Sequence, residues 1–194
     1  KIGIAFLFAP LFHPSTKKVA HVRKELAMRS VFNLLGPLSN PAGANCQLLG
    51  VSQEGLAEKI VHVLKRLGRP HAFVVCGRDG MDEVTLTDQT VVYRLEKGRI
   101  TRSIFRPESA GMKRASPKAL AGGNADENAA IARKILAGKR GPKRDAVVLN
   151  AAFGLMAAGR VKNIKDGVRL AEDSLDSGRA QMKLHQLVQA TQTH

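Results

Sequence analysis

Two adjacent acidic residues follow an apolar segment that has the length of a buried strand. The apolar segment covers residues 71–76, and the glycine-containing stretch after it ends in Asp82 and Glu83. In α/β proteins, ligands gather beyond the carboxyl ends of the strands. Mg²⁺ takes one or two carboxylates together with phosphate oxygens and water, so this pair is a candidate magnesium site. For an isolated Asp-Glu pair, a solvated acidic turn is the simpler explanation. The position of this pair after a buried strand, in a chain with only 16 acidic residues, strengthens the case for a metal site.

A second group of candidate residues lies nearer the front of the sequence. Arg23 falls in residues 17–27, whose apolar positions share one face of a predicted helix. A guanidinium group can hold a carboxylate bidentately, although a solvated surface cation is the more common role of an arginine. His13 precedes Pro14, which keeps it out of a helix interior, and it is a candidate site residue or a loop histidine with local hydrogen bonds.

The segment from Asn33 to Gly43 contains a predicted loop. It reads NLLGPLSNPAG, and its prolines and glycines exclude regular structure over residues 36–41. A stiff loop of this kind brings backbone close to a flat ligand or to a neighbouring element. A plain connection between domains is the alternative interpretation.

The charge of the chain limits the classes of partner. Its 31 Lys and Arg against 16 Asp and Glu give a formal net charge of +15, which attracts nucleic acid, membrane surfaces or phosphorylated metabolites. Aromatic residues make up only 4%, which argues against single-strand binding because that binding uses stacking platforms. Cys46 and Cys76 are too few for a disulfide framework or a cysteine metal site, and they favour a reducing compartment. No apolar run approaches the roughly 18–20 residues that cross a bilayer.

Strand and helix patterns alternate along the chain. Strands are predicted over residues 2–9, 47–51, 71–76 and 84–86, with a hairpin over 91–95 and 99–105 that turns at Gly98. Helices are predicted over residues 17–27, 30–35, 54–67, 124–137, 143–158, 163–177 and 180–189. Asn124 and Glu127 have the spacing of a capping box. The helix over 143–158 is apolar all round, so we expect it to be buried. We expect the basic stretch 133–144 to be a solvated face. Strand pairs among helices predict an α/β fold with a mixed sheet.

Several of these segments, in this order and spacing, resemble the anthranilate phosphoribosyltransferases, which catalyse the second step of tryptophan biosynthesis. The matching runs are GIAFLFAP at 3–10, FHP at 12–14, VRKEL at 22–26, FNLLGPLSNPAG at 32–43, GMDE at 80–83, GGNADENA at 122–129 and LNAA at 149–152. The NLLGPLSNP run is highly specific, and the similarity covers nearly the whole chain.

The resemblance implies a fold of the nucleoside phosphorylase and phosphoribosyltransferase class. Residues 1–16 would be a strand and loop of an α/β domain, residues 17–40 helices of a small helical domain, and residues 41–194 the rest of the α/β domain, with its mixed central sheet flanked by helices. The family's glycine-rich pyrophosphate loop and its Lys-His-Gly-Asn segment would lie before residue 1. We therefore expect an N-terminally truncated fragment that is inactive alone.

The resemblance also implies a reaction and roles for residues. The amine of anthranilate would attack the anomeric carbon of phosphoribosyl pyrophosphate, giving N-(5-phosphoribosyl)anthranilate and pyrophosphate, with Mg²⁺ as cofactor. Asp82 and Glu83 match the metal-binding pair, and Arg23 matches the arginine that holds the anthranilate carboxylate. The other matched substrate-binding positions are Pro10, His13, Gly36 and Pro37.

The expected setting is a cytoplasmic homodimer, when complete, that binds neither membrane nor nucleic acid. Two alternatives remain at this point. The net charge of +15 motivates a non-catalytic protein of the same fold that binds nucleic acid or another polyanion. The pyrimidine nucleoside phosphorylases share the architecture, although the Gly-Pro-Leu-Ser-Asn-Pro loop argues against them.

Overall fold

The computed structural model describes residues 2–8, 12, 38–40 and 42–192. The chain divides into two compact units, which we call unit 1 (residues 1–44) and unit 2 (residues 45–194). The strands and helices whose bounds the structure describes all belong to unit 2.

Residues 2–8 of unit 1 form no strand with any other described residue. The strand predicted over residues 2–9 is wrong for the described residues 2–8, which pair with none of the strands in the described structure. A strand needs a neighbour that exchanges backbone hydrogen bonds with it, and apolar composition alone does not supply one. The Phe6 side chain is 73% exposed, and its ring stacks on that of Phe8 with a centroid distance of 6.3 Å.

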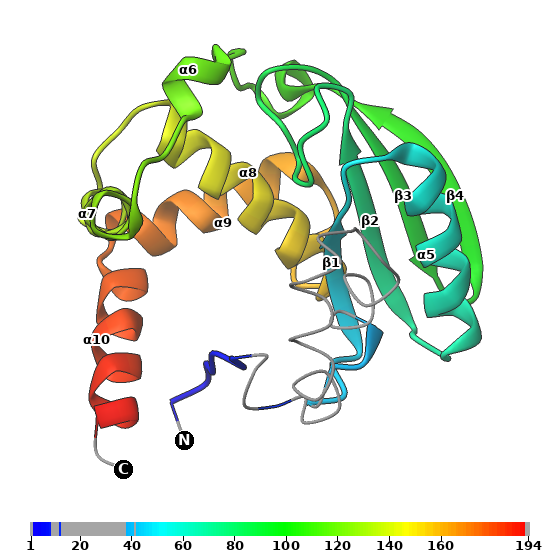
Figure 1. The fold of residues 1–194 in the computed structure, drawn as a ribbon, viewed down its shortest axis with the longest axis horizontal. Coiled ribbons are helices and arrows are strands. Elements are labelled where there is room, and N and C mark those ends of the chain that lie inside the picture. Colours follow the sequence, from blue (N-terminus) through cyan, green and yellow to red (C-terminus); the bar gives the residue numbers. More distant parts are fainter. Residues whose placement is uncertain (1, 9–11, 13–37, 41, 193–194) are drawn as a thin grey trace, which may run out of the picture. The chain divides into compact units, whose positions relative to one another are not determined.

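Four strands of unit 2 form one mixed sheet in the order β1-β2-β3-β4 (Figure 1). Strand β1 (Cys46–Gly50) runs parallel to β2 (His71–Gly77), and helix α5 (Glu54–Arg66) connects them. Strands β3 (Thr90–Glu96) and β4 (Arg99–Phe105) follow in antiparallel order. The predicted mixed sheet is confirmed, and so is the β3–β4 hairpin. Its two-residue turn has positive φ at Lys97 (48°) and at the expected Gly98 (77°), which suits a tight hairpin turn.

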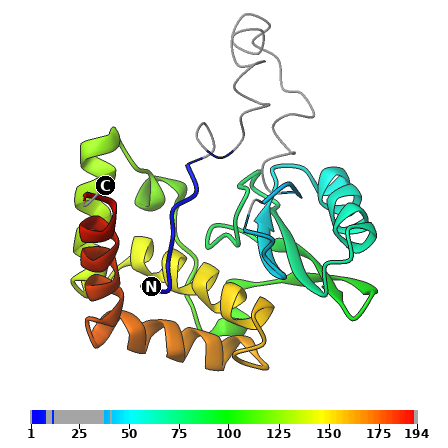
Figure 2. The ribbon, with the colours of Figure 1, turned by 90° about the horizontal axis from the view of Figure 1, so that it is seen from below.

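Helices cover both faces of this sheet, so β2 and β3 are buried on both sides. On one face, Phe73 and Val75 of β2 pack against Leu149 and Phe153 of α8 (Pro142–Ala157). The rings of Phe73 and Phe153 meet edge to face with centroids 5.5 Å apart. The alternate residues of β2 are also buried and face α5, which packs against β2 and β3. Figures 1 and 2 show α5 and α8 on opposite sides of the strands.

The remaining helices complete unit 2 beyond α8. They are the short η1 (Pro107–Ala110) and α6 (Pro117–Leu120), and the longer α7 (Ala125–Leu136), α9 (Ile164–Asp176) and α10 (Arg179–Gln192). Helix α9 crosses α8 closely, because a Cβ atom placed on Gly167 would lie 2.9 Å from the Cβ atom of Ala152. The capping box of Asn124 and Glu127 at the start of α7 is confirmed.

Helix α8 departs from the prediction in two ways. Its face that carries Val147 and Ala151 is exposed, whereas the apolar composition predicted a helix buried all round. Arg144, which belonged to the predicted solvated stretch 133–144, is buried instead. Its guanidinium group lies 2.7 Å from Asp176 Oδ1 and 3.7 Å from Glu172 Oε1, and an arginine becomes buried when such partners compensate its charge.

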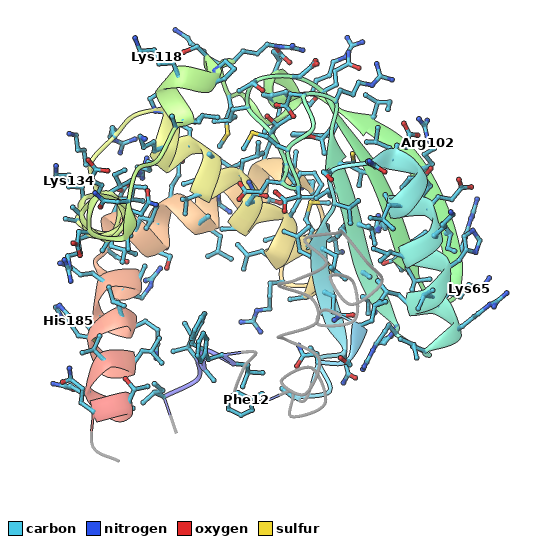
Figure 3. The ribbon with its side chains drawn as sticks, in the orientation of Figure 1. Phe12, Lys65, Arg102, Lys118, Lys134 and His185 are labelled. Carbon is cyan, nitrogen blue, oxygen red and sulfur yellow. The ribbon has the colours of Figure 1, made fainter. Side chains whose placement is uncertain are left out.

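Four other cations of that stretch are exposed, namely Arg133, Lys134, Lys139 and Arg140, and so are many elsewhere in unit 2. Figure 3 shows the side chains of Lys65, Lys118 and Lys134 pointing outward from α5, α6 and α7 respectively. The positive charge is therefore distributed over several separate elements of unit 2. None of the described helices has the length and apolar character of a membrane span.

Candidate functional site

The loop over residues 78–89 connects β2 to β3 and carries the predicted acidic pair. Asp82 and Glu83 lie beyond the carboxyl end of β2, as the sequence predicted, and both side chains are exposed. Within the described part of the chain, neither carboxylate has a hydrogen-bond or ion-pair partner in a protein rich in cations. Both carboxylates are therefore available to bind a cation.

Strand β1 fixes the backbone of Asp82 from one side. Because β1 and β2 are parallel, their carboxyl ends lie at the same edge of the sheet, and Gly50 is the last residue of β1. A Cβ atom on Gly50 would lie only 1.5 Å from the carbonyl oxygen of Asp82 and 2.4 Å from its carbonyl carbon. Only glycine permits this approach, so the sequence at the end of β1 determines where Asp82 sits.

Asp79 organises the first half of the loop. Its carboxylate accepts hydrogen bonds from the hydroxyls of Thr85, at 2.6 Å, and Thr87, and from the backbone N–H of Met81 at 3.1 Å. Burial acts to raise the pKa of the Asp79 carboxyl, but the hydrogen bonds from the two threonines and Met81 outweigh it and hold this pKa below its ordinary value. Asp79 therefore stays ionised and shapes the loop, whereas Asp82 and Glu83 remain available to a ligand.

The residues that follow the acidic pair are held by side chains, not by a strand ladder. A strand was predicted over Val84–Leu86, and this prediction is wrong, although all three residues are buried. The N–H of Val84 donates to Oδ1 of Asn150 at 3.0 Å, and Nδ2 of Asn150 donates to the carbonyl of Val84 at 2.9 Å. The N–H of Thr85 donates to Oγ1 of Thr90 at 3.1 Å. These side-chain partners satisfy backbone groups that a neighbouring strand would otherwise satisfy.

The sequence analysis missed the roles of Asp79 and Asn150. A signal for Asp79 was present, because an aspartate before glycine with threonines six and eight positions later can close a loop on its own carboxylate. A signal for Asn150 was present too, since it is a polar residue inside an apolar helix pattern.

The donor set of this loop fits Mg²⁺ better than ions that need a complete protein cage. Among the described residues, no group of three or more His, Cys, Asp or Glu side chains is placed to hold a metal ion. Structural Zn²⁺ needs four protein ligands, whereas Mg²⁺ is commonly held by one or two carboxylates together with phosphate oxygens and water. The Asp82–Glu83 pair supplies that smaller set.

The other predicted site residues lie outside the described part of the chain. They are Pro10, His13, Arg23, Gly36 and Pro37. Of the loop predicted over residues 36–41, residues 38–40 are described. Leu38 is helical, so the prediction is wrong at this residue, and Ser39 lies in a turn. The N–H of Ala42 donates to Oδ1 of Asn40 at 2.9 Å, and the N–H of Gly43 donates to the Asn40 carbonyl at 3.0 Å.

Comparison with known proteins gives consistent matches over almost the whole chain. Residues 1–181 match the family model described as the glycosyl transferase family, a/b domain. The anthranilate phosphoribosyltransferase of Geotalea uraniireducens is 51% identical over 191 residues, and that of Moorella thermoacetica is 52% identical over 188 residues. These matches cover 98% and 97% of this chain but 55% and 56% of the two relatives, so the chain spans about half their length.

Solved structures agree with these relatives. The crystal structure of anthranilate phosphoribosyltransferase from Thermus thermophilus superposes with a TM-score of 0.89 at 45% identity, over 96% of this chain and 55% of that one. The enzyme from Saccharomyces cerevisiae in complex with PRPP and Mg superposes with a TM-score of 0.89 at 28% identity, over 97% of this chain and 55% of that one. None of these four proteins is described as a nucleic-acid-binding protein or a pyrimidine nucleoside phosphorylase.

Proposed function

The chain belongs to the glycosyl transferase family through its a/b domain, and from this premise we propose that the complete protein is an anthranilate phosphoribosyltransferase. The amine of anthranilate attacks the anomeric carbon of phosphoribosyl pyrophosphate, and pyrophosphate leaves. Relatives that are about 50% identical and carry this name support the proposal. The activity is assigned to the complete protein, because this chain spans about half of those relatives.

The observation that carries the proposal is the exposed Asp82–Glu83 pair beyond the end of β2, whose carboxylates have no partner among the described residues. These carboxylates would hold Mg²⁺, and the Saccharomyces cerevisiae structure described with PRPP and Mg supports that choice of ion. When bound, the ion neutralises charge on the departing pyrophosphate. The close approach of Gly50 and the hydrogen bonds of Asp79 restrain the backbone of the loop that carries the two carboxylates.

The substrate contacts belong to residues outside the described part, and their support is the sequence match. Arg23 would hold the carboxylate of anthranilate through its planar guanidinium group. Four further residues would line the substrate site, namely Pro10, His13, Gly36 and Pro37. Both substrates are anions, so the net charge of +15 suits them without a nucleic-acid partner.

The remaining expectations form part of the same proposal. The complete protein is a cytoplasmic homodimer. Residues 17–40 belong to its small helical domain, and residues 1–16 and 41–194 belong to its α/β domain. The similarity to anthranilate phosphoribosyltransferases supports this division.

The test is the consumption of anthranilate by the complete protein, followed as the loss of anthranilate fluorescence. We expect the loss to require both phosphoribosyl pyrophosphate and Mg²⁺, and Asp82→Asn to raise the Mg²⁺ concentration that gives half of the maximal rate. Glu58→Gln is the matched control, because it removes an exposed acid of α5 that lies outside the loop. Fluorescence that is stable with all components present would refute the proposal.

A further inference from the structure

We infer that Asn150 of α8 is a positioning residue for the Asp82–Glu83 pair, an inference that rests on the proposed role of this pair in metal binding. Asn150 lies 66 residues from Val84 in the sequence, yet its amide bonds both backbone groups of Val84. Val84 follows Glu83 directly and is 1% exposed. Whatever fixes the backbone of Val84 therefore also fixes the direction in which the chain leaves the two carboxylates.

The side-chain amide of Asn150 has the groups needed to bond both the N–H and the carbonyl of Val84. It offers an acceptor oxygen and a two-proton donor nitrogen in one plane. The oxygen accepts from the N–H of Val84, and the nitrogen donates to the carbonyl of Val84 and, at 3.0 Å, to that of Ala146 one helical turn earlier. The bond to Ala146 holds the amide in place on its own helix. Asn150 thus acts toward Val84 as a short neighbouring strand would.

The position of Asn150 in the sequence is otherwise costly. Asparagine lowers helix stability because its side chain competes for backbone hydrogen bonds. Here it stands between Leu149 and Ala151 in a helix of mostly apolar residues. A residue that is unfavourable for its own helix, as asparagine is here, is expected at positions where a functional site needs its side chain. The position of Asn150, next to the loop that carries the acidic pair, fits such a requirement.

Asn150 completes a set of three restraints on this loop. The backbone of Asp82 rests against Gly50, and the carboxylate of Asp79 gathers the residues on either side of the pair. Asn150 restrains the chain immediately after the pair. Of the three, only Asn150 acts through a side chain from a different element, so it can be removed without altering the sequence of the loop or of the sheet.

The test compares Asn150→Ala with Val148→Ala in the complete protein. Val148 is fully buried on the same helix, but it packs in a different cluster with Ile135, Ala171 and Leu175. Val148→Ala therefore lowers stability without touching Val84. Two quantities are measured, namely the exchange of the Val84 amide proton and the binding of Mn²⁺ alone, followed by the loss of its free-ion EPR signal.

We expect Asn150→Ala to expose the Val84 amide to exchange while the Val74 amide in the centre of the sheet stays protected. We also expect about a tenfold weaker affinity for Mn²⁺, a loss typical of removing a group that supports metal ligands. Val148→Ala should change the protection of both amides together and leave the Mn²⁺ affinity unchanged. Asn150→Asp, which keeps an acceptor for the Val84 N–H but loses the donor, should fall between wild type and Asn150→Ala.

The outcomes separate this inference from the proposed function. A Val84 amide that stays protected in Asn150→Ala, or a Mn²⁺ affinity equal to that of the wild type, would overturn the positioning role while Asp82→Asn still weakens binding. If Asp82→Asn leaves Mn²⁺ binding unchanged, the metal site itself is refuted and the inference fails with it.

Discussion

Replacing Gly50 by alanine should displace the backbone of Asp82. The φ angle of Gly50 is not in the positive range, so alanine suits the backbone there and the obstacle is space alone. The new Cβ atom would lie 1.5 Å from the Asp82 carbonyl oxygen, and real contacts of a Cβ atom stay beyond 3.0 Å, so the two must separate by at least the difference of 1.5 Å. Overpacking of this kind typically costs about 1–3 kcal/mol of folding free energy.

The consequence for activity should exceed the consequence for stability. A misplacement of about 1 Å at a reacting centre can cost roughly 100-fold in rate. We therefore expect Gly50→Ala to lower kcat/KM about 100-fold in the complete protein and to raise its Mg²⁺ requirement. The melting temperature should fall by roughly 2–4 °C per kcal/mol lost. The assays are a Mg²⁺ titration of anthranilate consumption and a thermal melt.

Gly55→Ala is the matched control for this experiment. A Cβ atom on Gly55 would meet nothing within 4 Å, and the residue lies in the first turn of α5. Alanine is the better helix former, so the control should keep its activity and melt at an equal or slightly higher temperature. If Gly50→Ala keeps the Mg²⁺ dependence and rate of the wild type, then the contact between β1 and Asp82 does not set the site, and the reasoning fails.

Two further predictions concern charged groups. Asp79→Ala should lower the free energy of unfolding by about 1–2 kcal/mol at pH 7, because three hydrogen bonds to a carboxylate are lost. The pKa of Asp79 is lowered in the folded state, so this contribution to stability is present above the unfolded pKa of about 3.9 and is lost as the pH falls through the folded pKa. Urea unfolding at pH 7 and pH 3 should therefore show a smaller difference in unfolding free energy between wild type and Asp79→Ala at pH 3. A larger difference at pH 3 would contradict this reasoning. Arg144→Ala should lower the free energy of unfolding by about 2 kcal/mol, because it removes a buried guanidinium from Asp176. Arg140→Ala removes an exposed partner of the same carboxylate and should lower it by about 0.5 kcal/mol or less in the same urea measurement. Equal losses would mean that burial does not strengthen the pair.

Elements whose signals are local in the sequence were predictable. The capping box at Asn124 depends on residues three positions apart, and the hairpin turn at Gly98 depends on a two-residue loop between apolar runs. The placement of Asp82 and Glu83 was predictable for the same reason, because they lie in the loop that follows a recognisable buried strand.

The wrong predictions share a dependence on distant partners. Residues 84–86 look like a strand because Val84 and Thr85 are β-branched and Leu86 is apolar, but the group that satisfies Val84 lies 66 residues away on α8. Arg144 looks like one of many surface cations until α9 supplies Asp176 beside it. No pattern within a window of a few residues contains such information. The assignments of Arg23 and the other substrate-binding residues stay predictions, because those positions lie outside the described residues.

The loop between β2 and β3 has already lost most of its conformational freedom in the folded chain, because Asp79, Asn150 and Gly50 restrain it from three directions. Ordering a residue costs on the order of 1–2 kcal/mol, and here folding has met that cost before a ligand arrives. The association of an ion with this loop should therefore lose little chain entropy. Its strength should be governed by how readily the two carboxylates and the ion give up their water.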